Sequence, residues 1–240
     1  MESKRIFLGI INFKIIKDCI FPVFCFGCKK EGYWLCPECF LKMEIDIQKA
    51  CPICHRYNNN GENCLGCEKQ SFLDFHLAIM KYEEEKLIGE LVHNFKYNYA
   101  EDIFGVFEKI ISGFLSQNIY YFENIDLIIP VPLHGRRFAE RGFNQAELIA
   151  NAIAKLTGKE VQSKAIVRQR YTSVQARLNK EERTHNVSGA FVMGGESVVE
   201  NKNILIVDDV FTTGSTLQEC AKLLKHSGAK KVSGFTLARG

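Results

Sequence analysis

Short apolar runs alternate with amphipathic stretches through most of this chain. Residues 204–207 form a run of four apolar residues, which is too short for a helix and predicts a fully buried strand. Further runs predict strands over residues 76–82, 126–134, 191–193 and 231–238. Apolar residues with a helical period predict helices over residues 84–98, 101–116 and 145–155, and one that begins near Leu217. This alternation predicts an α/β fold, with a mainly parallel sheet flanked by helices on both faces.

Two acidic residues and a small polar turn follow the run at 204–207. Asp208 and Asp209 come first, and five small, mostly hydroxylated residues lead into the next helix: Thr212, Thr213, Gly214, Ser215 and Thr216. In an open α/β sheet, ligands bind beyond the carboxyl ends of the strands, where the N–H groups of such a turn hold an anion. Carboxylates repel phosphate but suit sugar hydroxyls or Mg²⁺. The combination predicts a site for a phosphorylated sugar, and an ordinary turn without a ligand is the plainer alternative.

A second candidate anion site follows the predicted strand at 126–134. This strand ends in two prolines, and the loop after it carries Arg136, Arg137 and Arg141 ahead of the next helix. Residues 133–185 hold eleven Lys and Arg against five Asp and Glu, although the chain of 240 residues has a net charge of only +3. Arginines before a helix N-terminus suit a pyrophosphate group. A basic turn exposed to solvent is the alternative.

Eight of the ten cysteines form four Cys-x-x-Cys pairs, a spacing typical of structural zinc sites. The candidate ligands are Cys25, Cys28, Cys36, Cys39, Cys51, Cys54, Cys64 and Cys67. Two pairs complete one tetrahedral site, so two Zn²⁺ ions are expected. The spacing favours successive pairing, the first pair with the second and the third with the fourth, but leaves an interleaved arrangement open. Because four thiolates around one Zn²⁺ carry net negative charge, we expect a structural module and not a basic nucleic-acid-binding finger.

The N-terminal segment is apolar but does not predict a membrane span. Lys14, Lys17 and Asp18 interrupt residues 5–24, and no run reaches the roughly 18–20 uncharged apolar residues that a bilayer requires. The segment fits a helix packed on the protein, with peripheral membrane association as the alternative. No signal peptide is visible, so a cytoplasmic protein with reduced thiols is expected. We expect two domains: residues 1–70, with this helix and a double zinc ribbon, and residues 71–240, with the sheet.

Residues 204–216 resemble the motif that binds 5-phosphoribosyl 1-pyrophosphate (PRPP) in type I phosphoribosyltransferases. The resemblance implies a fold of that class, with the 5′-phosphate on residues 212–216 and Mg²⁺ bound with PRPP. It also implies that the ribose hydroxyls meet two candidate catalytic residues, Asp208 and Asp209. By the same resemblance, residues 168–183 correspond to a flexible loop that closes over the substrate. The implied pyrophosphate site consists of Leu133, His134, Gly135, Arg136 and Arg137, with Arg141 nearby.

Residues 141–145 and 172–191, together with the cysteine pairs, resemble a narrower group, the ComF family of competence-associated proteins. The likeness extends over residues 21–238. It implies a role in DNA uptake during natural competence, with single-stranded DNA and a competence helicase as candidate partners. Phe138, Phe143 and Tyr171 are candidate residues for stacking on DNA bases. A basic surface that faces only solvent is the alternative.

Three functions fit these features. The first is ComF-like handling of single-stranded DNA by a protein that binds PRPP or a related phosphorylated ribose. The second is an active PRPP-dependent phosphoribosyltransferase with an unidentified acceptor, since no stretch identifies a hood that reads a base. The third is a non-catalytic regulator that senses PRPP or nucleotides. Lys96 is a further candidate for the ligand cleft, and a solvated lysine is the alternative.

Overall fold

The computed structural model describes residues 22–97, 100–171, 187–195 and 199–240. The chain divides into two compact units, Met1–Met43 and Glu44–Gly240. The predicted N-terminal helix, and residues 172–183 of the predicted flexible loop, lie outside the described residues. Among the helices that are described, none is long and apolar enough to cross a membrane. The domain boundary at residue 70 stays a prediction.

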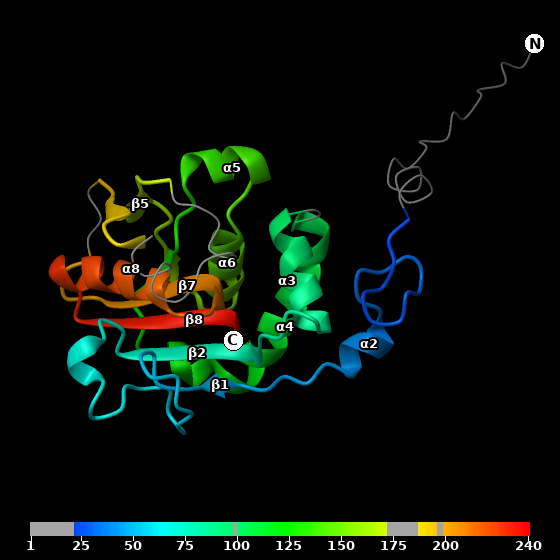
Figure 1. Cartoon of the computed structure of the whole chain (residues 1–240), viewed down its shortest axis with the longest axis horizontal. Coiled ribbons are helices and arrows are strands. Elements are labelled where there is room, and N and C mark those ends of the chain that lie inside the picture. The colour runs from blue at the N-terminus through cyan, green and yellow to red at the C-terminus, as the bar shows by residue number, and fades with distance from the viewer. Residues whose placement is uncertain (1–21, 98–99, 172–186, 196–198) are drawn as a thin grey trace, which may run out of the picture. The chain divides into compact units, whose positions relative to one another are not determined.

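The larger unit is built around a six-stranded sheet with the strand order β1-β2-β8-β7-β3-β4 (Figure 1). All neighbouring strands are parallel except β1 and β2, which confirms the predicted mainly parallel sheet. The central strands are buried on both faces, and for this reason they consist of almost continuous apolar runs. Their bounds are β1 (Gln48–Lys49), β2 (Phe75–Lys81), β3 (Leu127–Pro130), β4 (Glu160–Val161), β7 (Asn203–Phe211) and β8 (Lys231–Arg239).

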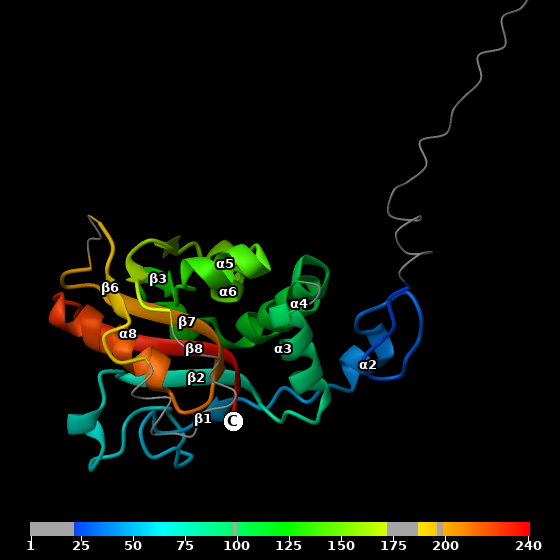
Figure 2. The ribbon, with the colours of Figure 1, turned by 45° about the horizontal axis from the view of Figure 1, so that its top comes forward.

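Helices pack on both faces of this sheet (Figure 2). Helix α8 (Ser215–His226) lies on one face, where a Cβ atom added to Gly234 of β8 would lie 3.4 Å from the Leu217 side chain. The next residue, Phe235, points to the other face, and its ring centre lies 6.1 Å from that of Phe114 in α4 (Ala100–Asn118). Two further helices pack against α4: α3 (Leu87–Tyr97) and α6 (Gln145–Thr157). Both faces of the sheet are therefore covered, as predicted.

Strand β7 extends beyond the predicted run of four residues. Its ladder with β8 continues through three further pairs: Asp208–Thr236, Val210–Ala238 and Phe211–Arg239. The expectation that Asp208 and Asp209 follow the strand was therefore wrong, since both lie inside it. Ladder hydrogen bonds join backbone groups, so polar side chains do not end the strand, and an apolar pattern underestimates its length.

The predicted arginine loop after β3 is largely a helix, which corrects the sequence prediction. Helix α5 spans Gly135–Arg141, and the ring of His134 caps it by accepting a hydrogen bond from the Arg136 N–H at 3.2 Å. Gly142, at φ 80°, ends α5 in the left-handed conformation that glycine adopts most readily. Helix α6 then begins after Asn144, whose side chain accepts from the Ala146 N–H. A short polar segment with strong caps can form a helix without an apolar period.

Two smaller features complete the described fold. Strands β5 (Ile166–Arg168) and β6 (Phe191–Met193) form a separate antiparallel pair, and β6 packs against α8. The smaller unit contains the short helix α2 (Pro37–Leu41) and a stacked pair of rings, Phe26 and Trp34, with centres 5.7 Å apart. The described residues of the larger unit include two 3-10 turns: η1 (Glu68–Gln70) and η2 (Ile119–Phe122).

Candidate functional site

A cavity of about 250 Å³ lies at the carboxyl ends of β3 and β7, beside the start of α8. Most of the site residues predicted from the sequence line it: Leu133, Arg137, Arg141, Asp208, Asp209, Thr212, Thr213, Gly214, Ser215 and Thr216. His134, Gly135 and Arg136, which begin α5, are outside the lining. The parallel sheet thus brings together two predicted anion sites that are far apart in the sequence.

Asp208 and Asp209 are adjacent carboxylates in different surroundings. The Asp209 N–H donates to Asp208 Oδ1 at 2.9 Å, and Lys96 Nζ lies 3.1 Å from Asp209 Oδ1. Burial, with the negative charge of Asp209 as the second cause, raises the pKa of Asp208 to about 7, while Lys96 acts in the opposite direction. Near neutral pH, Asp208 is therefore only partly ionised. Such a pair can accept hydrogen bonds from hydroxyl groups or hold a divalent cation.

The turn at residues 212–216 has the geometry of an anion site. Its backbone passes through Gly214, at φ 76°, into the 12-residue helix α8. The first N–H groups of that helix therefore lie at the cavity, at the positive end of the helix dipole. The hydroxyls of Thr213 and Ser215 lie 2.8 Å apart and offer further hydrogen-bond donors. A phosphate group matches this combination of charge and donors.

Four basic side chains line the same cavity: Lys96, Arg137, Arg141 and Arg168. Arg141 Nη1 donates to Gln145 Oε1 at 3.2 Å, which orients its guanidinium group. Lys96 comes from the last turn of α3. Its ion pair with Asp209 places it in the cleft, which is the first of the two positions considered from the sequence. The cavity therefore combines a phosphate-type turn, a carboxylate pair and several cations that can neutralise further phosphate charge.

Arg168 is a cavity residue whose position differs from the one that the resemblance implies. The resemblance puts it at the start of the flexible loop, but it ends β5, is only 8% exposed, and lies with its Cζ 5.3 Å from the centre of the Phe191 ring. Burial, followed by the charge of Arg137, lowers its pKa, although an arginine at neutral pH stays protonated. No local sequence pattern marks this position, because the burial of Arg168 depends on its contact with Phe191 in β6.

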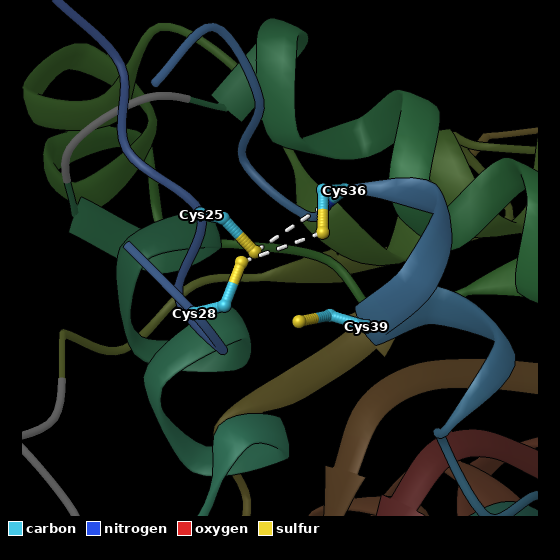
Figure 3. Close-up of side chains that lie close together, drawn as sticks. All are labelled: Cys25, Cys28, Cys36 and Cys39. Carbon is cyan, nitrogen blue, oxygen red and sulfur yellow. Dashed lines mark hydrogen bonds between the residues drawn. The ribbon is translucent and has the colours of Figure 1, made fainter. Parts of the chain in front are cut away.

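The first four cysteines meet at one point in the smaller unit. The sulfur atoms of Cys25, Cys28, Cys36 and Cys39 all lie within 4.8 Å of one another (Figure 3). A tetrahedral Zn²⁺ with Zn–S bonds of about 2.3 Å needs sulfur atoms about 3.8 Å apart, which this group can provide with little movement. The Cys36 N–H also donates to Cys25 Sγ at 3.3 Å, as expected for a thiolate ligand. These residues fit a structural zinc site.

The other four cysteines of the Cys-x-x-Cys pairs form a second group in the larger unit. The sulfur atoms of Cys51, Cys54 and Cys67 lie within 4.8 Å of one another, and Cys64 Sγ lies 3.8 Å from Cys54 Sγ. The pairs therefore meet successively, and the interleaved arrangement that the spacing left open does not occur. Both groups could hold a metal ion, and four thiols at this spacing are compatible with zinc.

The first knuckles of the two groups have the same backbone geometry. In each, the residue after the second cysteine has a positive φ, 63° at Lys29 and 61° at His55, and its N–H donates to the carbonyl of the first cysteine. Burial acts to raise the pKa of Cys25 and of Cys51, but backbone N–H groups around each thiolate lower it to about 6. The first knuckles of the two sites are thus structural repeats.

Comparison with known proteins gives consistent results. Residues 101–240 match the family model of the phosphoribosyl transferase domain. The chain is similar to the DNA utilization protein YhgH of Shigella flexneri, with 28% identity over 91% of this chain and 97% of that protein. It is also similar to the competence protein ComFC of Streptococcus pneumoniae, with 28% identity over 88% of this chain and 90% of that protein.

Among solved structures, a purine phosphoribosyltransferase from Pyrococcus horikoshii Ot3 matches with a TM-score of 0.35 and 22% identity, over 54% of this chain and 70% of that one. The match to the family model covers more than half of the chain, and the cysteine groups and the two relatives extend the agreement to the N-terminal part. The chain therefore belongs to the phosphoribosyl transferase domain family and, within it, to the ComF family.

Proposed function

We propose that the cavity binds PRPP, or a related phosphorylated ribose, together with Mg²⁺. The observation that carries this proposal is the presence of the 212–216 turn, the Asp208–Asp209 pair and three arginines in the lining of one cavity. The turn suits a terminal phosphate, the carboxylates suit ribose hydroxyls, and the arginines suit a pyrophosphate group. Mg²⁺ would neutralise part of the pyrophosphate charge.

The contribution of the protein would be positioning and electrostatics. A phosphate on the turn fixes one end of the ribose, and Asp209, held by Lys96, orients its hydroxyls. Arg137, Arg141 and Arg168 then surround a diphosphate at the other end of the sugar with positive charge. In a transferase, this charge would stabilise the departing pyrophosphate. In a sensor, the same contacts would supply affinity without turnover.

Isothermal titration calorimetry with PRPP and Mg²⁺ tests the proposal. Asp209→Asn should weaken binding about tenfold or more, because a hydrogen bond to a charged group contributes about 1.5–3 kcal/mol. Lys155→Ala, at an exposed ion pair with Glu108 in α4, is the matched surface control. Equal affinity of Asp209→Asn and the control would reject the carboxylate assignment. Release of pyrophosphate in the presence of nucleobases would identify a transferase, and binding without release a sensor.

A second proposed function is the handling of single-stranded DNA, which agrees with the competence and DNA utilization names of the two relatives. The supporting observation is an exposed aromatic and basic surface at α5. Tyr171 is 43% exposed, and the Cζ atoms of Arg136 and Arg137 lie 5.4 and 6.0 Å from its ring centre. Phe138 is 48% exposed, whereas Phe143 packs with its ring centre 6.1 Å from Phe95. Tyr171 and Phe138 are therefore the better stacking candidates.

Fluorescence anisotropy with a labelled oligothymidine, titrated against salt, tests this surface. Tyr171→Ala should weaken binding by roughly 1–3 kcal/mol, the usual contribution of one stacked base. Tyr120→Ala is the control, since Tyr120 is also exposed but is in η2. If both variants bind like the wild type, DNA does not use the α5 surface. A competence helicase remains a predicted partner.

A further inference from the structure

Phe211 connects the phosphate-type turn to a buried cluster on its other side. It ends β7, is 1% exposed, and immediately precedes residues 212–216. A Cβ atom added to Gly214 would lie 2.4 Å from Phe211 Cζ, so the turn rests directly on this ring. The ring centre of His76 lies 4.0 Å from that of Phe211, and that of His55 lies 5.7 Å away. The position of Phe211 therefore limits where the turn can lie.

Arg239 joins Phe211 to the second cysteine group. The residue is 4% exposed, and its Cζ lies 4.4 Å from the centre of the Phe211 ring. Arg239 Nη1 donates to the carbonyl of Ala50 at 3.0 Å, and Nη2 donates to the carbonyl of Cys51 at 2.9 Å. The Cys51 carbonyl also accepts the His55 N–H that closes the knuckle, at 3.1 Å. One planar group thus binds the backbone of a metal-ligand residue and stacks on the ring below the turn.

His76 holds Arg239 in this orientation. Arg239 Nη1 lies 3.0 Å from His76 Nδ1, and because a guanidinium has no acceptor, Nδ1 must accept. The proton of the neutral ring is therefore on Nε2, which lies 3.2 Å from the hydroxyl of Thr236. That hydroxyl in turn donates to the carbonyl of Ala238 at 3.0 Å. Each polar atom in this buried chain has a defined role, so the cluster has little freedom to rearrange.

We propose that Arg239 and Phe211 are positioning residues through which the metal at Cys51, Cys54, Cys64 and Cys67 fixes the 212–216 turn for its phosphate. Metal binding would order the knuckle, so that the Cys51 carbonyl holds the Arg239 guanidinium in place. Arg239 in turn holds the Phe211 ring, and the ring fixes the position of Gly214 in the turn. The second metal site is then a functional part of the ligand pocket, while the first belongs to the other compact unit. The measurement of ribose 5-phosphate binding described below rests on the proposed function, whereas the hydrogen-exchange measurement does not. By linkage, a ligand on the turn must tighten metal binding by the same factor by which the metal tightens the ligand.

Hydrogen exchange of matched cysteine variants tests this coupling without a ligand. Cys64→Ser/Cys67→Ser disrupts the second metal site, and Cys36→Ser/Cys39→Ser disrupts the first. The second-site variant should exchange roughly 5- to 150-fold faster in peptides over 211–217, the usual range of coupling between sites, while peptides over β3 keep their protection. The first-site variant should exchange like the wild type at 211–217. Equal exchange of the two variants at the turn would overturn the proposal.

Arg239→Met separates positioning from metal loss, because it keeps all eight candidate ligand cysteines. It should retain both metal ions by mass spectrometry, yet show faster exchange at 211–217 and weaker binding of ribose 5-phosphate by roughly 5- to 150-fold. Phe211→Leu should have the same effects with the arginine hydrogen bonds intact. Unchanged exchange in both variants rejects the link. If the wild type binds no ribose 5-phosphate or PRPP, the proposed function fails, but the exchange results still decide the coupling.

Discussion

The ammonium group of Lys96 lies 3.1 Å from a carboxylate oxygen of Asp209, although the two residues come from different elements, α3 and β7. The contact places a positive charge where the carboxylate pair would otherwise repel itself. Burial and the charge of Asp209 raise the pKa of Asp208, and the positive charge of Lys96 partly offsets this increase. The charge of the candidate site is therefore set jointly by a helix and a strand.

The raised pKa of Asp208 predicts a pH-dependent stability. Its pKa rises from 3.8 to about 7 on folding, so the folded protein binds more protons between these values and loses stability as pH increases through this window. Asp208→Asn should flatten the slope and be more stable than the wild type at pH 8, since each pKa unit corresponds to about 1.4 kcal/mol. Urea unfolding between pH 4 and 8 measures this. Glu200→Gln, which also replaces a carboxylate by an amide but at an exposed position, is the control variant.

Lys96→Met should shift the same window upward. Without the ammonium group, the pKa of Asp208 increases further, so stability continues to fall above pH 7. In the double variant Lys96→Met/Asp208→Asn, the part of the slope that Asp208 contributes should be absent, because this titrating group is gone. A Lys96→Met profile identical to that of the wild type would show that the ion pair does not affect the carboxylates. Unfolding curves at pH 7, 8 and 9 distinguish these outcomes.

Gly214→Ala should destabilise the protein more than Gly158→Ala. Both glycines have a positive φ, 76° and 70°, so each substitution carries a conformational cost of about 1 kcal/mol. A Cβ atom at Gly214 also meets Phe211 Cζ at 2.4 Å, whereas one at Gly158 has no neighbour within 4 Å among the described residues. The collision should add about 1–3 kcal/mol. Chemical denaturation of the two variants isolates this contribution, and equal losses would contradict it.

Arg168→Met should weaken binding of PRPP by roughly 10- to 100-fold, because a charged hydrogen-bond donor in the lining is removed. Arg168→Lys should not restore it, since an ammonium cannot reproduce the planar pair of donors. Arg170→Met is the control, because Arg170 is exposed and donates to the carbonyl of Ser188 at 2.6 Å. Calorimetry of the three variants gives the comparison. Full rescue by lysine would mean that only charge is required at this position.

The successive pairing of cysteines can be tested by counting ions. Cys25→Ser/Cys36→Ser removes two ligands of the first group, so one metal ion per chain should be lost and one retained. With interleaved pairs, the same variant would damage both sites and lose both ions. Native mass spectrometry distinguishes the results. Removal of metal by a chelator should unfold each knuckle, since small loops without a core depend on the ion.

The sequence predicted those parts of the fold that depend on local patterns. The buried runs of β7 and β8, the helices at α3 and α4, and the cysteine groups follow from periodicity and spacing. Helix α5 could not be predicted in this way, because it is defined by a histidine cap at its start and the left-handed Gly142 at its end, and not by an apolar period. The roles of Arg168 and Arg239 could not be predicted from local patterns, because they depend on contacts with distant residues. Arg168 contacts the Phe191 ring, and Arg239 donates to the Cys51 carbonyl. Long-range packing, and not composition, decides these positions.

The repeated knuckle also determines which sulfur atoms an external reagent can reach. In both groups, the first cysteine, Cys25 or Cys51, is buried, and the second, Cys28 or Cys54, is exposed. An alkylating or oxidising molecule therefore approaches both groups from the same side of the knuckle. Damage by electrophiles would begin at Cys28 and Cys54, and a thiol-reactive probe added at limiting concentration would mark these two positions together.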